Sequence, residues 1–254
     1  MSVDFALLLF VLTVAGGLIW AFDAAVLAPK RRAEGRTDMP VVVEYARSLF
    51  PVILIIFLLR SFVAEPFRIP SSSMEPTLEE GDLILVSKFA YGIRLPVLNR
   101  LVVDLGTPER GDVVVFRFPQ DPRQDYIKRV VGLPGDEIVY IDKRLYVNGE
   151  LVQEESLGPA LTEEGFEVVE YGEKLGEVEH RIYKMPRRHD PRRFDIVVPE
   201  GRYFVMGDNR DNSNDSRGWG FVPDENLVGR AFLIWMNWRV GEWPEWNRIG
   251  NVIR

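Results

Sequence analysis

The chain of 254 residues contains no cysteine and two histidines. Without cysteine it cannot form a disulfide framework, a thiol nucleophile, or a zinc or iron–sulfur site built on thiolates. Two histidines are too few for a histidine-rich metal site, and they give little support to a histidine-dependent triad. Basic residues are also in the minority, 31 against 38 acidic ones, for a net charge of −7. This balance argues against nucleic acid as the main partner, because phosphate binding needs a basic face.

The motifs of several enzyme classes are also missing. There is no Gly-x-Ser-x-Gly nucleophile elbow, no glycine-rich phosphate loop, no His-Glu-x-x-His zinc motif and no calcium loop with its required glutamate. Ser73 does not begin a Ser-x-x-Lys motif, because Met74-Glu75-Pro76 follows it. A hydrophobic content of 46% and a charged content of 27% exclude a disordered or collagen-like chain.

Two apolar segments lie near the N-terminus. Phe5–Phe22 is a run of 18 uncharged residues, which at about 1.5 Å per residue nearly crosses a hydrocarbon core of about 30 Å. Residues 1–29 contain no Lys or Arg, so the positive region of a cleaved signal peptide is missing and we expect a retained span. The second segment, 48–64, contains Pro51 and Arg60. An arginine near a helix end can reach the interface, but a buried core helix remains an alternative.

Basic residues between these two segments predict the topology. None precedes the first segment, so the positive-inside rule places the loop 23–47 in the cytoplasm. Both termini then face the opposite side, and everything after about Ala64 is exported. We therefore expect residues 1–64 to form a membrane anchor with two transmembrane helices. The basic residues of the loop are Lys30, Arg31, Arg32, Arg36 and Arg47.

From Arg68 onward the helical period disappears and short apolar runs take over, bounded by Gly, Pro, Asp or Asn. This pattern predicts a mostly β, antiparallel domain over residues 65–149 and 196–254. Asn148-Gly149 predicts a type I′ hairpin, because both residues tolerate positive φ. The runs are Leu83–Val86, Val113–Phe116, Ile138–Ile141, Leu145–Val147, Ile196–Val198, Tyr203–Met206 and Ala231–Trp235.

The segment 150–195 between the two parts of this domain differs in composition. Ten glutamates between Glu150 and Glu179 are accompanied by one base, and six basic residues follow up to Arg193. We interpret it as a solvated, charged insert or small subdomain without a site. Its two histidines, His180 and His189, are predicted to lie on the surface.

Two polar segments, 68–77 and 206–217, are candidates for function, because polar loops carry function more often than strands do. Ordinary serine-rich loops and solvated turns are the alternatives. Between them, Tyr126, Lys128 and Val130 share one face of a predicted strand. Burial can lower a lysine pKa from about 10.4 by several units, and a neutral amine can act as general base for a serine hydroxyl. The alternative is an exposed lysine that protects an edge strand.

Four segments, in this order, resemble the boxes of bacterial type I signal peptidases, and the resemblance covers about residues 45–250. The resemblance implies an antiparallel β-sheet catalytic domain with the signal peptidase/LexA-like architecture. It also implies a bacterial inner membrane location with the catalytic domain on the exported face, and no metal or organic cofactor. The boxes are Pro70–Leu78, Gly111–Phe116, Tyr126–Asp136 and Gly207–Arg217.

The resemblance assigns roles to individual residues. It implies that Ser73 is the nucleophile, that Lys128 is the general base and that the Ser71 hydroxyl helps the Ser73 amide to hold the oxyanion. Ser213 matches the residue that orients the lysine, and Tyr126 matches one that shapes the site. The supporting positions, expected to be ion-paired, are Asp208, Arg210, Asp215 and Arg217. The candidate walls of the substrate pocket are Phe67, Ile69, Leu78, Ile84, Val115, Tyr126 and Ile127.

The position of Ser73 indicates the substrate class. It lies nine residues beyond Ala64, so it is at most about 30 Å from the bilayer edge at about 3.3–3.6 Å per residue. A bond cut there lies just outside a membrane-inserted segment, as it does in a signal peptide, whose apolar region ends in small residues. We therefore expect preprotein signal peptides and the lipid bilayer as partners, and no nucleic acid or metal.

The C-terminal region is unusually aromatic, with Trp235, Trp238, Trp243 and Trp246. Tryptophan favours membrane interfaces, so we expect some of these residues to seat the catalytic domain on lipid. Ordinary packing within a strand is the alternative.

Two other functions are compatible with parts of the sequence. A LexA-like self-cleaving regulator would share the β architecture and a Ser-Lys pair, but residues 1–64 do not resemble a DNA-binding domain. A catalytically dead, membrane-tethered binding module would typically lack the serine or the lysine, and both are present.

Overall fold

The computed structural model of the chain describes residues 5–35, 38–94, 101–239 and 241–254, and it divides into two compact units. The first falls within residues 1–65 and 93–103, and the second comprises 66–92 and 104–254. Arg36, one of the basic residues behind the topology prediction, lies outside the described residues.

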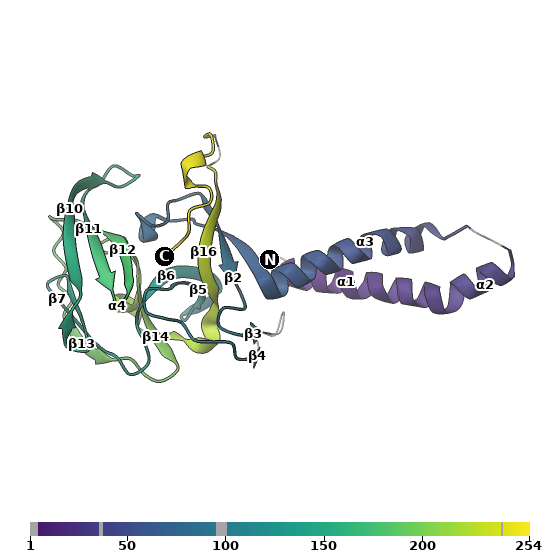
Figure 1. Cartoon of the computed structure of the whole chain (residues 1–254), viewed down its shortest axis with the longest axis horizontal. Helices are drawn as coiled ribbons and strands as arrows, with labels where there is room; N and C mark the ends of the chain where they lie inside the picture. Colours follow the sequence, from purple (N-terminus) through teal and green to yellow (C-terminus); the bar gives the residue numbers. More distant parts are fainter. Residues whose placement is uncertain (1–4, 36–37, 95–100, 240) are drawn as a thin grey trace. The chain divides into compact units, whose positions relative to one another are not determined.

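The first unit contains two long apolar helical segments that run side by side (Figure 1). Their aromatic rings meet, with 6.0 Å between the centroids of Phe10 and Phe57 and 5.5 Å between those of Trp20 and Phe50. Residues Leu7–Ala33 and Val41–Val63 both have a mean hydropathy of 2.1 and are long enough to cross a membrane, by length and composition. The elements are α1 (Phe5–Phe22), α2 (Ala28–Ala33), α3 (Val41–Leu58), the π-helical turns Asp23–Leu27 and Leu59–Val63, and the strands β3 (Ile93–Arg94) and β4 (Leu101–Val103).

The second apolar helix begins earlier than the sequence predicted. It starts at Val41 rather than at residue 48, directly after Pro40, which has φ −60° and ψ 138°. Proline before the first turn suits a helix start, because its fixed φ and missing N–H cost nothing there. Glu44 and Arg47 lie in the first turns of this helix. These two charged residues interrupt the apolar run, so an uncharged run of residues marks only the later part of the helix.

The second unit is built from antiparallel sheets, as Figure 1 shows. Among the described residues its largest sheet has seven strands, in the order β1-β2-β16-β5-β6-β14-β15. Strands β5 and β6 therefore lie inside this sheet rather than at an edge. Its members are β1 (Ala64–Arg68), β2 (Asp82–Ser87), β5 (Val113–Phe118), β6 (Asp121–Gly132), β14 (Arg202–Met206), β15 (Val222–Pro223) and β16 (Leu227–Asn237).

The described residues of this unit also form two smaller sheets and the short helix α4 (Ser216–Trp219), and the predicted apolar runs coincide with strands to within a few residues. The mostly β, antiparallel fold class is therefore confirmed. Asn148 and Gly149 have φ of 53° and 80° and connect β8 to β9, as a type I′ hairpin requires. The smaller sheets are β13 (Phe194–Val197), β7 (Glu137–Ile141), β8 (Arg144–Val147) and β9 (Glu150–Leu151), and β10 (Gln153–Leu161), β11 (Glu167–Leu175) and β12 (Val178–Lys184).

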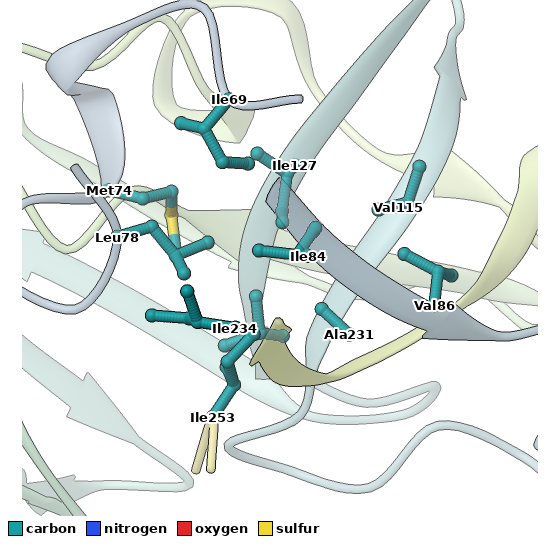
Figure 2. Close-up of a cluster of buried hydrophobic side chains, with 11 residues drawn as sticks. Ile69, Met74, Leu78, Ile84, Val86, Val115, Ile127, Ala231, Ile234 and Ile253 are labelled. Atoms are coloured by element: carbon teal, nitrogen blue, oxygen red, sulfur yellow. The ribbon is translucent and has the colours of Figure 1, made fainter. Parts of the chain in front are cut away.

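Both faces of β5 are covered by apolar side chains. Val113 and Val115 belong to one buried cluster, part of which Figure 2 shows, whereas Val114 and Phe116 belong to a second cluster. Successive side chains of a strand point to opposite faces, so this sheet is buried on both sides here. The second half of the neighbouring strand β6 is also buried, because β6 lies between β5 and β14 in the interior of this sheet.

Candidate active site

The serine-rich loop before β2 is held at both of its ends by apolar side chains. Ile69 and Met74 are both buried in the cluster of Figure 2, and a short 3₁₀ turn covers Ser72–Met74. Of the three serines between them, Ser72 is buried. Ser71 is exposed and Ser73 is half-buried, which presents the Ser73 hydroxyl at the edge of the core.

Lys128 on β6 meets Ser73. Its Nζ lies 2.7 Å from Ser73 Oγ and 2.7 Å from the carbonyl oxygen of Ile127. The lysine is 4% exposed and lies on an interior strand, which rules out the alternative of an exposed edge-strand lysine. Burial lowers its pKa from 10.5 to about 8, Arg217 reinforces the effect, and Asp215 and Asp208 oppose it. A large share of this amine is therefore neutral at mildly basic pH.

Three other predicted residues lie around this pair. Ser71 Oγ is 3.3 Å from Ser73 Oγ. The Tyr126 ring lies on the same side of β6 as the lysine, with 5.7 Å from Lys128 Nζ to the ring centroid. Ser213 Oγ is buried and lies near Asp215, whose pKa it helps to lower, and the described residues show no hydrogen bond between Ser213 and Lys128.

A second loop, 207–214, clamps the serine-rich loop. The Asn209 backbone N–H donates to the Ser73 carbonyl at 3.2 Å, and its side-chain amide donates to the Ser72 carbonyl at 3.1 Å. Asn212 Nδ2 donates to Ser72 Oγ at 3.0 Å. Gly207 lies so close that an added Cβ would be 2.5 Å from the Ser73 carbonyl oxygen. The clamp therefore needs glycine at this position and fixes the backbone of the nucleophile.

The predicted supporting charges are ion-paired, but not all of them with one another. Asp215 and Arg217 form a two-bond pair with distances of 2.8 and 2.7 Å. Asp208 instead pairs with Arg129, at 2.8 and 2.6 Å. Burial alone would raise the pKa of both carboxyls, but the adjacent guanidinium groups hold each pKa below its ordinary value. Both carboxylates are therefore charged while they act on Lys128.

Arg210 contacts the charged segment 150–195, which its composition predicts to be a solvated insert without a site. It forms a two-bond pair with Glu173 of β11, and both side chains are almost completely buried. His180 of β12 lies 3.1 Å from Glu173 and its side chain is 2% exposed, so its predicted surface position is wrong. Alternation along β12 turns His180 and Ile182 inward, and segment composition hides this period of two. His189 is exposed, as predicted.

Ser73 and Lys128 open onto a cleft of about 1020 Å³. Of the predicted pocket walls, Tyr126 and Ile127 line this cleft. The remaining predicted walls lie in or against the buried cluster of Figure 2 and not along this cleft: Ile69, Leu78, Ile84 and Val115 are buried in the cluster, and Phe67 packs against it. The described residues contain no group of three His, Cys, Asp or Glu side chains that could hold a metal ion.

Several residues that shape the site have no role predicted from the sequence. Arg129 and Asn209 lie inside the quoted boxes, so their position was a usable signal. Thr77, which donates to Asp208, also lies in a box. Glu173 carried no such signal, because it is one of ten similar glutamates in a charged segment.

Known proteins that are similar to this chain are signal peptidases. Residues 42–238 match the family described as signal peptidase, peptidase S26. The chain is 48% identical to signal peptidase I of Pseudomonas aeruginosa over 99% of its own length and 100% of the relative. For the Haemophilus influenzae enzyme the identity is 35%, with 94% and 88% covered. A crystal structure of a signal peptidase I from Enterococcus faecalis, 27% identical, covers 50% of this chain and 98% of the other, with a TM-score of 0.31.

Proposed function

This chain belongs to the signal peptidase family, peptidase S26, and we propose that it removes signal peptides with Ser73 as nucleophile and Lys128 as general base. Membership makes the chain a serine peptidase and argues against a LexA-like regulator or a catalytically dead binding module. Cleavage of a preprotein with Ser73→Ala as control separates these three functions. The observation that carries the proposed dyad is the 2.7 Å contact between Lys128 Nζ and Ser73 Oγ in a buried setting.

In the proposed reaction, Ser73 Oγ attacks the carbonyl carbon of the scissile peptide while the neutral Lys128 amine takes the hydroxyl proton. The Ser73 N–H and the Ser71 hydroxyl stabilise the oxyanion, and one such donor lowers a barrier by about 3–4 kcal/mol. Lys128 then gives its proton to the leaving amine, and an acyl ester with Ser73 remains. A water molecule, deprotonated by Lys128, hydrolyses this ester and restores the free serine.

The protonation state of Lys128 depends in this scheme on three nearby charged residues, Asp215, Asp208 and Arg217. The two carboxylates favour the ammonium that forms during attack, while burial and Arg217 lower the pKa of the resting amine. A general base works best when its pKa is near the operating pH. The pKa of about 8 for Lys128 therefore fits its proposed role in both proton transfers.

We propose that the substrate is cut after small side chains. Tyr126 and Ile127 line the cleft next to Ser73. Ile127 belongs to the buried cluster of Figure 2, and Tyr126 packs against the cluster that contains Val114 and Phe116. Because both clusters are close-packed, they leave little room for a bulky side chain of the substrate. A preprotein with alanine before the cut is expected to be processed. Leucine or phenylalanine at the same position should abolish cleavage, and undiminished turnover of such a substrate would count against this part of the proposal.

We also propose that the two apolar helices anchor the chain in the bacterial inner membrane. The basic residues between 30 and 47 favour a cytoplasmic connection, which would put the peptidase unit on the exported face where signal peptides emerge. Trp243 and Trp246 are 89% and 71% exposed. Such exposure of large rings supports contact with lipid rather than packing within the unit.

The direct test is cleavage of a preprotein by the purified full-length chain in detergent. Ser73→Ala and Lys128→Ala should each be folded and nearly inactive. Ser156→Ala and Lys174→Ala, which alter an exposed serine on β10 and an exposed lysine on β11, are matched controls and should cleave normally. Appreciable cleavage by either of the first two variants would refute the dyad.

A further inference from the structure

The sheet β10–β12 contacts the loop that clamps the nucleophile. We infer that this sheet is a positioning element of the active site, and that Glu173 on β11 acts through Arg210 to hold Ser73 in its attacking position. The inference rests on the proposed role of Ser73. It gives a catalytic purpose to a segment whose composition is that of a solvated insert.

The first link is the buried ion pair. Arg210 places two guanidinium nitrogens on the two carboxylate oxygens of Glu173, and the side chains are 2% and 0% exposed. Such a fork fixes orientation as well as distance. Burial alone would raise the pKa of Glu173, but Arg210 and His180 hold it well below its ordinary value. The pair therefore stays charged wherever Lys128 can act as a base.

The second link is a backbone ladder between β12 and the clamp loop. The Tyr183 N–H donates to the Asp208 carbonyl at 2.9 Å, and the Arg210 N–H donates to the Tyr183 carbonyl at 2.9 Å. Residues 208 and 210 thus pair with Tyr183 as neighbouring parallel strands do. Arg217 adds a bond of 2.5 Å to the Arg210 carbonyl. The ends of this short extended segment are therefore held by the insert sheet and by the ion-paired Arg217.

The third link runs from Asn209 to the nucleophile. Because its two neighbours direct their backbone groups toward Tyr183, the Asn209 N–H points to the opposite side, where it donates to the Ser73 carbonyl at 3.2 Å. Its side chain donates to the Ser72 carbonyl at 3.1 Å. A displacement of Arg210 therefore moves Asn209, and with it the backbone that carries the Ser73 hydroxyl.

Glu173→Gln tests this connection, because it keeps the shape of the side chain and removes its charge. Misplacement of a reacting group by about 1 Å can lower the reaction rate by about 100-fold. The kcat for preprotein cleavage should therefore fall by about 10- to 100-fold, while KM stays within about two-fold of its original value. Glu170→Gln is the matched control: Glu170 lies on the same strand and pairs at 3.1 Å with Arg181, which is 68% exposed. It should leave both constants unchanged.

Two further variants separate positioning from stability, since Glu173→Gln leaves a buried charge unpaired. Glu173→Gln combined with Arg210→Met removes both charges and should restore a near-native Tm, yet keep the low kcat. Glu173→Asp keeps the charge with a shorter reach and should show a smaller fall in kcat. A folded double variant, or a folded Glu173→Asp, with native kcat would overturn the inference.

Hydrogen exchange gives a readout that a purely stabilising role would not produce. In Glu173→Gln the amides of 206–214 should exchange faster, while those of β5 keep their protection. Equal acceleration in both segments would mean global destabilisation and would contradict the inference. Failure of the proposed dyad can be distinguished from failure of this inference. Cleavage by Ser73→Ala would contradict the dyad. An inactive Ser73→Ala together with fully active Glu173 variants would contradict this inference alone.

Discussion

Replacement of Lys128 by methionine should abolish cleavage and, at neutral pH, stabilise the fold. Burial lowers the pKa of this lysine from 10.5 to about 8, so below pH 8 the folded chain must keep an ammonium in a dry place. The unfolded chain binds more protons than the folded chain between about pH 8 and 10.5, so wild-type stability rises with pH across that window. Methionine has a similar length and no charge to desolvate.

The size of the effect follows from the contacts of Lys128. At about 1.36 kcal/mol for each unit of pKa, the lowering from 10.5 to about 8 corresponds to about 3 kcal/mol. Methionine also loses the two hydrogen bonds to Ser73 and to the Ile127 carbonyl, each worth about 1 kcal/mol. Lys128→Met should therefore be more stable by about 1 kcal/mol below pH 8, and less stable by about 2 kcal/mol above pH 10.5.

Thermal unfolding of the full-length chain in one detergent, at pH 7, 8.5 and 10.5, measures this difference. For a unit of this size 1 kcal/mol moves Tm by about 2–4 °C, so the variant should unfold at a higher temperature at pH 7 and at a lower one at pH 10.5. Lys174→Met, on the exposed side of β11, is the control and should show no such crossing. A gap of constant sign and size at all three pH values would refute the reasoning.

Two other perturbations test the clamp and the lipid contact. Gly207→Ala should lower kcat by about 100-fold, because the new Cβ would overlap Ser213 Oγ and lie 2.5 Å from the Ser73 carbonyl oxygen. Gly172→Ala, whose Cβ would meet its first neighbour at 3.9 Å, should keep kcat, and equal values for both variants would contradict the account. In a fragment without the two apolar helices, Trp243→Ser with Trp246→Ser should weaken binding to anionic liposomes in a sedimentation assay. Unchanged binding would contradict the proposal that Trp243 and Trp246 contact lipid.

Local patterns in the sequence predicted much of the fold. Short apolar runs with turn residues between them located the strands, and the Asn148-Gly149 hairpin has both positive φ values that the residues allow. These features depend on neighbours in the chain, so a single sequence carries them. The helix start at Val41 was missed because Glu44 and Arg47 interrupt the apolar run that marked the span.

Pairings between distant residues could not be predicted in the same way. Asp208 meets Arg129 because β14 and β6 pair with Met206 opposite Arg129, and a sequence does not state this register. The burial of Glu173 depends on β11 and β12 folding against the clamp loop, which averaged composition cannot reveal. Ser73 and Lys128 could be named from the resemblance, but their 2.7 Å contact and the dryness of the amine needed the fold.

The most direct test of the account is the pH dependence of kcat/KM for a preprotein that ends its signal peptide in alanine. Activity should rise with pH and level off near pH 8, at the pKa of about 8 expected for buried Lys128. Lys128→Ala should show no such rise, because its activity is lost. A limb that continues to pH 10.5, or a rise of equal size in Lys128→Ala, would contradict the claim that a dry, neutral amine activates Ser73.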